Sequence, residues 1–82
     1  MEQVSEAEPM HHLDISTETC PMTFVRMRLL LDRLPAGAVL DVRFRGEEPR
    51  RNLPRAAAEQ GHTVLALEDL ADGLGRLVLR KG

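Results

Sequence analysis

Two stretches of the chain alternate apolar with polar residues, which is the period-two pattern of strands that bury one face. The first covers residues 10–16, and the second covers residues 40–45 and carries charged side chains on its outer face. Two further runs rich in β-forming residues, 63–68 and 76–81, flank residues 72–75. Because that segment contains Asp and Gly residues that favour a turn, the last two runs should form a closing hairpin.

Between the first two strands, apolar residues recur at helical spacing from position 21 to position 34. The stripe consists of Phe24, Met27, Leu30, Leu31 and Leu34. Pro21 suits the first helical position, where no intrahelical hydrogen bond needs its N–H. Pro35 and Gly37 disfavour continuation of the helix, so we expect it to end there.

A second, shorter helix is predicted over residues 53–60, after a turn at residues 46–49. Asn52 is a favourable N-cap, and Gly61 is a favourable stop. Pro54 is tolerated in this interpretation because it would lie in the first helical turn.

The order of elements is therefore strand, helix, strand, helix, strand, strand. The first two connections are each long enough to cross over between parallel neighbouring strands. Strands with one apolar face and helices with one apolar stripe bury these surfaces against each other. The pattern thus predicts a two-layer α/β architecture.

Length and composition fit one small domain. Eighty-two residues suffice for a single core, which we assign to residues 10–82, behind a flexible acidic tail at residues 1–9. With 43% hydrophobic and 29% charged residues, and no apolar run near the roughly 20 residues of a bilayer span, the chain is typical of a soluble protein. We expect no membrane partner.

The charge balance gives little attraction to polyanions. The 11 basic and 13 acidic residues leave a net charge of −2, and the only aromatic residues are Phe24 and Phe44. Neither a general positive field nor a stacking platform for RNA is present in the sequence, so we expect no direct nucleic-acid partner.

A single cysteine, Cys20, excludes an internal disulfide and a zinc site built from several thiols. The tail lacks the basic and apolar regions of a signal peptide. We therefore expect a cytoplasmic monomer without a cofactor or metal ion, in which the thiol stays reduced.

Cys20 immediately precedes Pro21, so its sulfur should lie at or beside the N-terminus of the first helix. Unpaired N–H groups and the positive end of the helix dipole stabilise a thiolate there, and Arg26 and Arg28 follow within the next turns. We predict a lowered pKa for the Cys20 thiol. Such a thiolate can attack a persulfide and present the acquired sulfur to an acceptor. The alternative is a small buried cysteine without a chemical role.

Taken together, the sequence resembles the TusA/SirA family of sulfur carriers over residues 11–82. The segments that carry the resemblance are Leu13-Asp14, Cys20-Pro21, Leu34 with Gly37, residues 40–44, Glu48-Pro49, Leu53-Pro54, Gly61-His62 and Arg80-Lys81-Gly82. The resemblance implies a two-layer sandwich with two helices on one face of a four-stranded mixed sheet, similar to the C-terminal domain of translation initiation factor 3. It also implies that Cys20 receives sulfane sulfur from a cysteine desulfurase or rhodanese-type donor. The acceptor protein would serve tRNA thiolation, molybdenum-cofactor maturation or sulfur metabolism.

The family motif is altered in this chain. Members typically carry Cys-Pro-x-Pro, whereas this sequence has Cys20-Pro21-Met22-Thr23, and Thr17 replaces a usual glycine. The Thr23 hydroxyl could hydrogen-bond the thiolate or cap the helix. We therefore take Pro21, Thr23, Arg26 and Arg28 as candidate supporting residues. The altered motif leaves open two other functions for this fold, a regulatory or scaffolding module and an RNA-binding domain.

Other residues have structural as well as functional explanations. Adjacent His11 and His12 should point to opposite faces of a strand and not share a metal ion, and His62 should pack at the start of the third strand. Val25 and Leu29 lie away from the main stripe of the first helix and could form an apolar patch for a partner. Five arginines could form a docking patch or an ordinary solvated surface: Arg43, Arg45, Arg50, Arg51 and Arg55.

Overall fold

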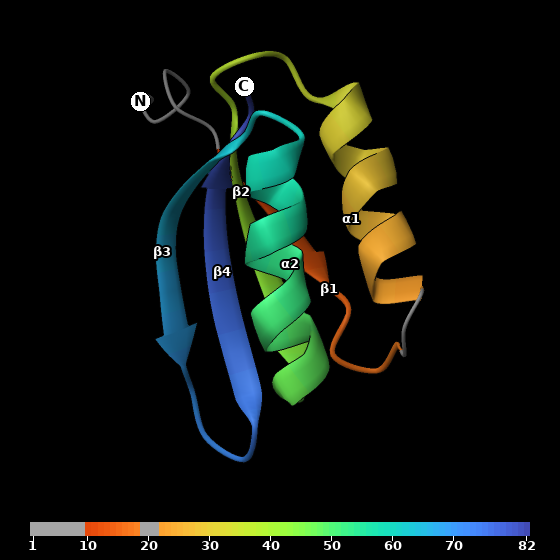
Figure 1. Ribbon diagram of the computed structural model, residues 1–82, viewed down its shortest axis with the longest axis vertical. Helices are drawn as coiled ribbons and strands as arrows, with labels where there is room; N and C mark the ends of the chain where they lie inside the picture. The colour runs from red at the N-terminus through yellow and green to blue at the C-terminus, as the bar shows by residue number, and fades with distance from the viewer. Residues whose placement is uncertain (1–9, 19–21) are drawn as a thin grey trace, which may run out of the picture.

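The computed structural model describes residues 10–18 and 22–82. Its elements are β1 (Met10–Asp14), α1 (Met22–Arg33), β2 (Val39–Arg45), α2 (Glu47–Glu59), β3 (Thr63–Asp69) and β4 (Leu74–Arg80). The predicted order of elements and the two-layer fold class are confirmed, and both helices lie on the same face of the sheet (Figure 1). The predicted tail, residues 1–9, lies outside the described residues.

The four strands form one mixed sheet in the order β1-β2-β4-β3. β1 runs parallel to β2, and β4 runs antiparallel to both of its neighbours. The second crossover was predicted to join neighbouring strands, and this was wrong, because β4 lies between β2 and β3. The burial of the two hairpin strands explains the order: Leu77, Val78 and Leu79 of β4 are buried, whereas β3 is exposed along nearly all of its length. The more deeply buried strand thus occupies the centre of the sheet.

The hydrophobic core lies between the sheet and the two helices. The sheet contributes Leu40, Val42, Phe44, Leu77 and Leu79, and the helices contribute Met27, Leu31, Leu53 and Ala57. Gly75 lies directly beneath Phe44, since a Cβ at this position would come within 2.2 Å of Phe44 Cζ. The centre of the sheet is therefore closely packed and leaves no room for a side chain at residue 75.

α2 is the element that differs most from its prediction. It begins at Glu47, six residues before the predicted start, so the predicted turn at residues 46–49 is wrong. Gly46 precedes the helix with φ 108°, a backbone conformation that favours glycine, and the acidic first turn suits the helix dipole. Pro54 consequently lies in the helix interior, where it lacks the N–H that would bond to the Arg50 carbonyl. Burial of Leu53 beside it offsets this cost.

The C-terminal end of α1 is held by the segment that follows β4. Lys81 Nζ donates hydrogen bonds to the carbonyls of Leu31 at 2.7 Å and Leu34 at 2.8 Å. Leu31 lies in the last turn of α1 and Leu34 follows the helix directly. The Leu31 carbonyl also accepts from the Leu34 N–H at 3.1 Å, so Lys81 adds a second donor at the end of the helix. Neither described helix is long and apolar enough to cross a membrane.

Candidate functional site

The segment between β1 and α1 is held in place up to Glu18. The Ile15 N–H donates to the Arg43 carbonyl at 2.8 Å, and the Glu18 N–H donates to the Ile15 carbonyl at 3.0 Å. The Ser16 hydroxyl and N–H both donate to Asp14 Oδ1, at 2.7 and 3.0 Å, and these bonds lower the pKa of the Asp14 carboxyl. The chain therefore leaves the sheet in a defined direction toward α1.

Two of the predicted site residues, Cys20 and Pro21, lie outside the described residues, as does Thr19. In sequence, Cys20 stands two positions after Glu18 and two positions before Met22, where the described part of α1 begins. Glu18 and Met22 are the described residues on either side of this segment.

Thr23 is buried at the start of α1, with 1% of its surface exposed. It lines a depression of about 230 Å³ together with Glu18 and the residues that lead into α2, namely Arg45, Gly46, Glu47, Glu48 and Pro49. Because β1 and β2 are parallel, their carboxyl ends meet at one edge of the sheet, and the starts of α1 and α2 meet there too. The depression is thus lined by Glu18 and Thr23, which flank the Cys20 segment in the sequence.

The sequence interpretation did not anticipate the residues opposite Thr23. Glu47 and Glu48 were assigned to a turn, and Arg45 to the charged face of a strand. Parallel pairing of the first two strands was the signal that could have placed them near the start of α1. The surroundings of the candidate site thus include carboxylates from both Glu18 and the first turn of α2.

The structure separates the two predicted arginine supports. Arg26 Nε lies 3.3 Å from Glu18 Oε2, so this guanidinium bridges α1 and the residue that precedes the Cys20 segment. Arg28 is two positions further along the helix, about 200° around its axis, and is exposed. The arginines therefore do not converge on one point, and the Arg26 charge is shared with a carboxylate.

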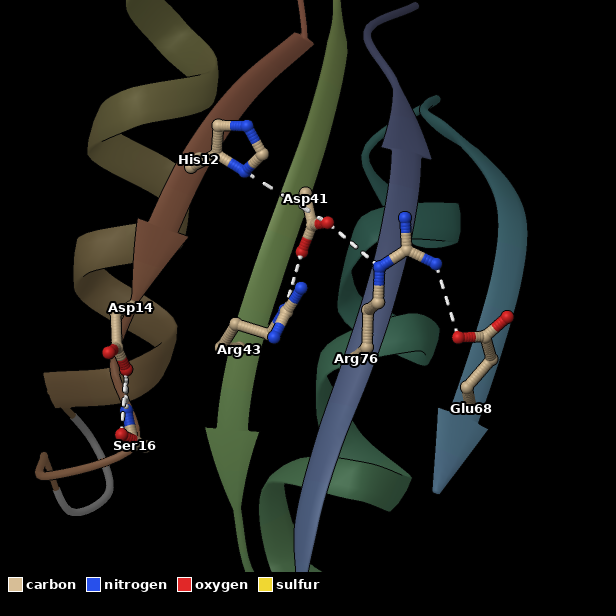
Figure 2. Close-up of polar contacts among 7 residues, drawn as sticks. All are labelled: His12, Asp14, Ser16, Asp41, Arg43, Glu68 and Arg76. Atoms are coloured by element: carbon tan, nitrogen blue, oxygen red, sulfur yellow. Dashed lines mark hydrogen bonds and ion pairs between the residues drawn. The ribbon is translucent and has the colours of Figure 1, made fainter. Parts of the chain in front are cut away.

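A second polar cluster crosses the sheet on the face opposite the helices (Figure 2). Asp41 is 2% exposed and accepts hydrogen bonds from Arg43 Nε at 3.1 Å and Arg76 Nε at 2.8 Å. Arg76 also donates to Glu68 at 3.1 Å, and His12 Nδ1 lies 4.0 Å from Asp41. Burial raises the pKa of the Asp41 carboxyl, but the hydrogen bonds from Arg76 and Arg43 outweigh this effect, and the net pKa is lowered. The hydrogen bonds of the cluster tie β2, β4 and β3 together, and His12 of β1 lies beside them.

The five arginines considered as one docking patch belong to opposite sides of the sheet. Arg43 lies in the Asp41 cluster, whereas Arg50 is on α2 and makes two hydrogen bonds to Asp69, at 2.6 and 3.1 Å. These contacts pair the charge of Arg50 with that of Asp69 and lower the pKa of the Asp69 carboxyl. The arginines do not form a single surface.

The histidines occupy separate structural positions. His11 is half-buried and His12 is exposed, since neighbours on β1 point to opposite faces. His62 lies just before β3 and accepts a hydrogen bond at Nδ1 from the Gly82 N–H at 3.0 Å. Within residues 10–18 and 22–82, no group of three or more His, Asp or Glu side chains could hold a metal ion.

A groove of about 380 Å³ lies between α1 and the edge strand β1. Val25 and Leu29, expected to be partly exposed, line it and are 37% and 59% exposed. The predicted apolar patch on α1 is therefore present, and it is concave.

The sequence and the fold are both similar to those of known proteins. The family model described as "Sulfurtransferase TusA" matches residues 11–81. A candidate sulfur carrier protein of Archaeoglobus fulgidus is 33% identical over 69 residues, which cover 84% of this chain and 78% of that protein. TsuB, a candidate sulfur carrier protein of Escherichia coli K12, is 25% identical over 69 residues, which cover 84% of this chain and 92% of TsuB. The crystal structure of a SirA-like protein from Desulfitobacterium hafniense has the same fold, with a TM-score of 0.78 and 23% identity over 90% of this chain and 99% of that one.

Proposed function

Because the chain belongs to the TusA sulfurtransferase family, we propose that it is a sulfur carrier that holds sulfane sulfur as a persulfide on Cys20. The observation that carries the proposal is the position of the only cysteine, two residues before the described start of α1, within a region matched by the family model. The helix N-terminus supplies N–H groups and a positive dipole end that favour a thiolate there.

The chemistry is a pair of thiol exchanges without net oxidation or reduction. The Cys20 thiolate attacks the terminal sulfur of a donor persulfide, the donor S–S bond breaks, and the donor cysteine leaves as a thiolate. A new S–S bond then joins Cys20 Sγ to the transferred sulfur. An acceptor nucleophile attacks that terminal sulfur in turn, and the Cys20 thiolate is the leaving group. A low thiol pKa assists this second step, because a less basic thiolate leaves faster.

The candidate supporting residues have distinct roles in this proposal. Pro21 sets the start of the helix, and Thr23 stabilises the thiolate or persulfide through its hydroxyl. Arg26 supplies positive charge near the start of α1, and its 3.3 Å ion pair joins the helix to Glu18, two positions before Cys20 in the sequence. Arg28 adds a more distant positive charge. The donor would be a cysteine desulfurase or a rhodanese-type protein, and the reducing cytoplasm would keep the lone thiol available.

The proposal is tested by loading the reduced protein with sulfur. The protein is incubated with a cysteine desulfurase and free cysteine, and its intact mass is measured before and after treatment with a thiol reductant. We expect wild type to gain one sulfur atom that the reductant removes, and Cys20→Ser to gain none. If wild type gains no more sulfur than Cys20→Ser, the regulatory or scaffolding alternative replaces the sulfur-carrier function.

A further inference from the structure

The groove along α1 is bounded by apolar side chains from two elements. Met22, Val25 and Leu29 of α1 line it on one side, and Leu13 of β1 lines it on the other. The three α1 side chains are 44%, 37% and 59% exposed, so a substantial apolar surface is in contact with solvent. Contiguous exposed apolar surface of this kind is typical of interaction sites.

The groove follows one face of α1. Residues 22, 25 and 29 are spaced by three and four positions, so their side chains lie above one another on one face of α1. With Arg33, which also lines the groove, this face spans about 16 Å at 1.5 Å per residue. A partner segment of roughly three helical turns has the matching length.

Two arginines give this apolar groove a positive charge. Arg26 and Arg33 are seven residues apart, and therefore about 10 Å apart along the helix axis, on nearly the same side of it. Arg33 makes no ion pair with any described residue, and Arg26 pairs with Glu18 alone. Among the described residues, the groove is thus lined by two arginines and no acidic residue, although the whole chain has a net charge of −2. The groove is therefore complementary to an acidic partner.

We propose that this groove docks an acidic amphipathic helix of the protein that exchanges sulfur with Cys20, an inference that rests on the proposed sulfur-carrier function. The apolar stripe of the incoming helix covers Met22, Val25 and Leu29, and two carboxylates seven residues apart pair with Arg26 and Arg33. A helix in a groove buries such a stripe through side chains at spacings of three and four residues. Docking there places the partner against Met22, which follows Cys20 by two positions in the sequence.

The test uses three synthetic helical peptides of about 14 residues. The first carries a leucine stripe flanked by two glutamates seven residues apart. The second has lysines in place of the glutamates, and the third has the same composition as the first with its glutamates on the opposite face. Binding to the ¹⁵N-labelled protein is followed by NMR. We expect the first peptide to shift the amide resonances of α1 and β1 and to bind about tenfold more tightly than either other peptide.

Variants locate the binding surface. Leu29→Glu and Arg33→Glu should each weaken binding of the first peptide about tenfold, because they place a negative charge in the groove. Leu65→Glu on β3 and Arg51→Glu on α2 are matched exposed controls and should leave binding unchanged. Equal binding of all three peptides, absence of binding by the first, or equal effects of groove and control variants would each overturn the inference.

Sulfur loading of the same preparations separates this inference from the function on which it rests. Loading of Cys20 without selective binding of the first peptide would overturn the docking groove and leave the sulfur-carrier function intact. Selective peptide binding without loading would support the acidic-helix docking surface and reject the sulfur-carrier function.

Discussion

The two edges of the sheet both expose apolar side chains, Val64, Leu65 and Leu67 on β3 and Met10 on β1, but their surroundings differ. On β3, Glu68 is bound to Arg76 at 3.1 Å and Asp69 to Arg50 at 2.6 Å, and the strand has a register shift between Val64 and Ala66. Charges and irregular register make an edge strand a poor template for pairing with another chain. Beside β1, by contrast, α1 leaves Leu29 59% exposed over an apolar groove.

We therefore expect residues that determine stability and residues that determine partner binding to lie in two different regions. The region made by β2, β4, β3 and α2 contains most of the closely packed core and the Asp41 cluster. The region made by α1 and β1 contains the start of the helix, the thiol segment and the groove. Substitutions among β2, β4, β3 and α2 should therefore change the free energy of unfolding. Substitutions of exposed residues on α1 or β1 should instead change sulfur transfer or the binding of a partner protein.

The strongest test of this division compares two leucines. Leu77 on β4 is fully buried, so Leu77→Ala should lower the free energy of unfolding by about 2–5 kcal/mol through lost burial and a cavity. Leu29→Ala, in the exposed groove, should change it by about 0.5 kcal/mol or less. Urea denaturation monitored by circular dichroism measures both. Similar losses in the two variants would contradict the division.

Gly75 provides a second test within the packed region. The Cβ of Gly75→Ala would meet the Phe44 ring at 2.2 Å, so the ring or the strand must move. We expect a loss of about 1–3 kcal/mol from overpacking, with sulfur loading at Cys20 retained in the folded fraction. Thermal unfolding measures the first effect and intact mass the second. An unchanged unfolding temperature would show that the close contact is not rigid.

Thr23 sharpens the comparison because it is a buried residue within the thiol-bearing region. Thr23→Val keeps the shape of the side chain and removes its hydroxyl, so a thiolate stabilised by that hydroxyl should show a higher pKa and slower loading, by up to about tenfold. The pH dependence of Cys20 alkylation by iodoacetamide reports the thiol pKa directly. If the pKa is unchanged while the protein loses stability, the hydroxyl caps the helix instead.

Asp41 should produce an effect on stability that is present at neutral pH and shrinks in acid. Its folded-state pKa is lowered, so the unfolded chain binds the proton more readily and the contribution of this carboxylate to stability is fully present above its unfolded pKa of about 3.9. That contribution is lost as the pH falls through the folded pKa. Asp41→Asn should therefore flatten the decline of stability below about pH 4–5. Urea midpoints measured between pH 7 and pH 3 check this, with Asp32→Asn at an exposed position as the control. If wild type and Asp41→Asn lose stability in the same way as the pH falls, the Asp41 carboxylate does not contribute to stability.

The sequence predicted the elements with clear periodicity and failed where tertiary packing overrode local signals. The alternation around Leu40, Val42 and Phe44 correctly indicated a buried strand face. The prolines of α2 were misleading, because Pro49 and Pro54 both suit a first helical turn and only one of them can define it. Burial of Pro49, Leu53 and Ala57 along one stripe is what places the start at Glu47.

Only part of the candidate site could be predicted from the sequence. Cys20 and its neighbours along the chain could be identified because they belong to one contiguous motif. The ion pair of Arg26 with Glu18 and the approach of Glu47 to the start of α1 depend on how parallel strands bring two helix starts together. The position of β4 between β2 and β3 was likewise set by relative burial and not by chain order.

The most direct test of the central claim is cyanolysis of the loaded protein. Wild type and Cys20→Ser are incubated with a cysteine desulfurase and cysteine and separated from both, and cyanide is then added. Cyanide takes the terminal sulfur of a persulfide and releases thiocyanate together with the cysteine thiolate. The account predicts one thiocyanate per chain from wild type and none from Cys20→Ser. Absence of thiocyanate from wild type, or equal amounts from both proteins, would contradict transfer of sulfur through Cys20.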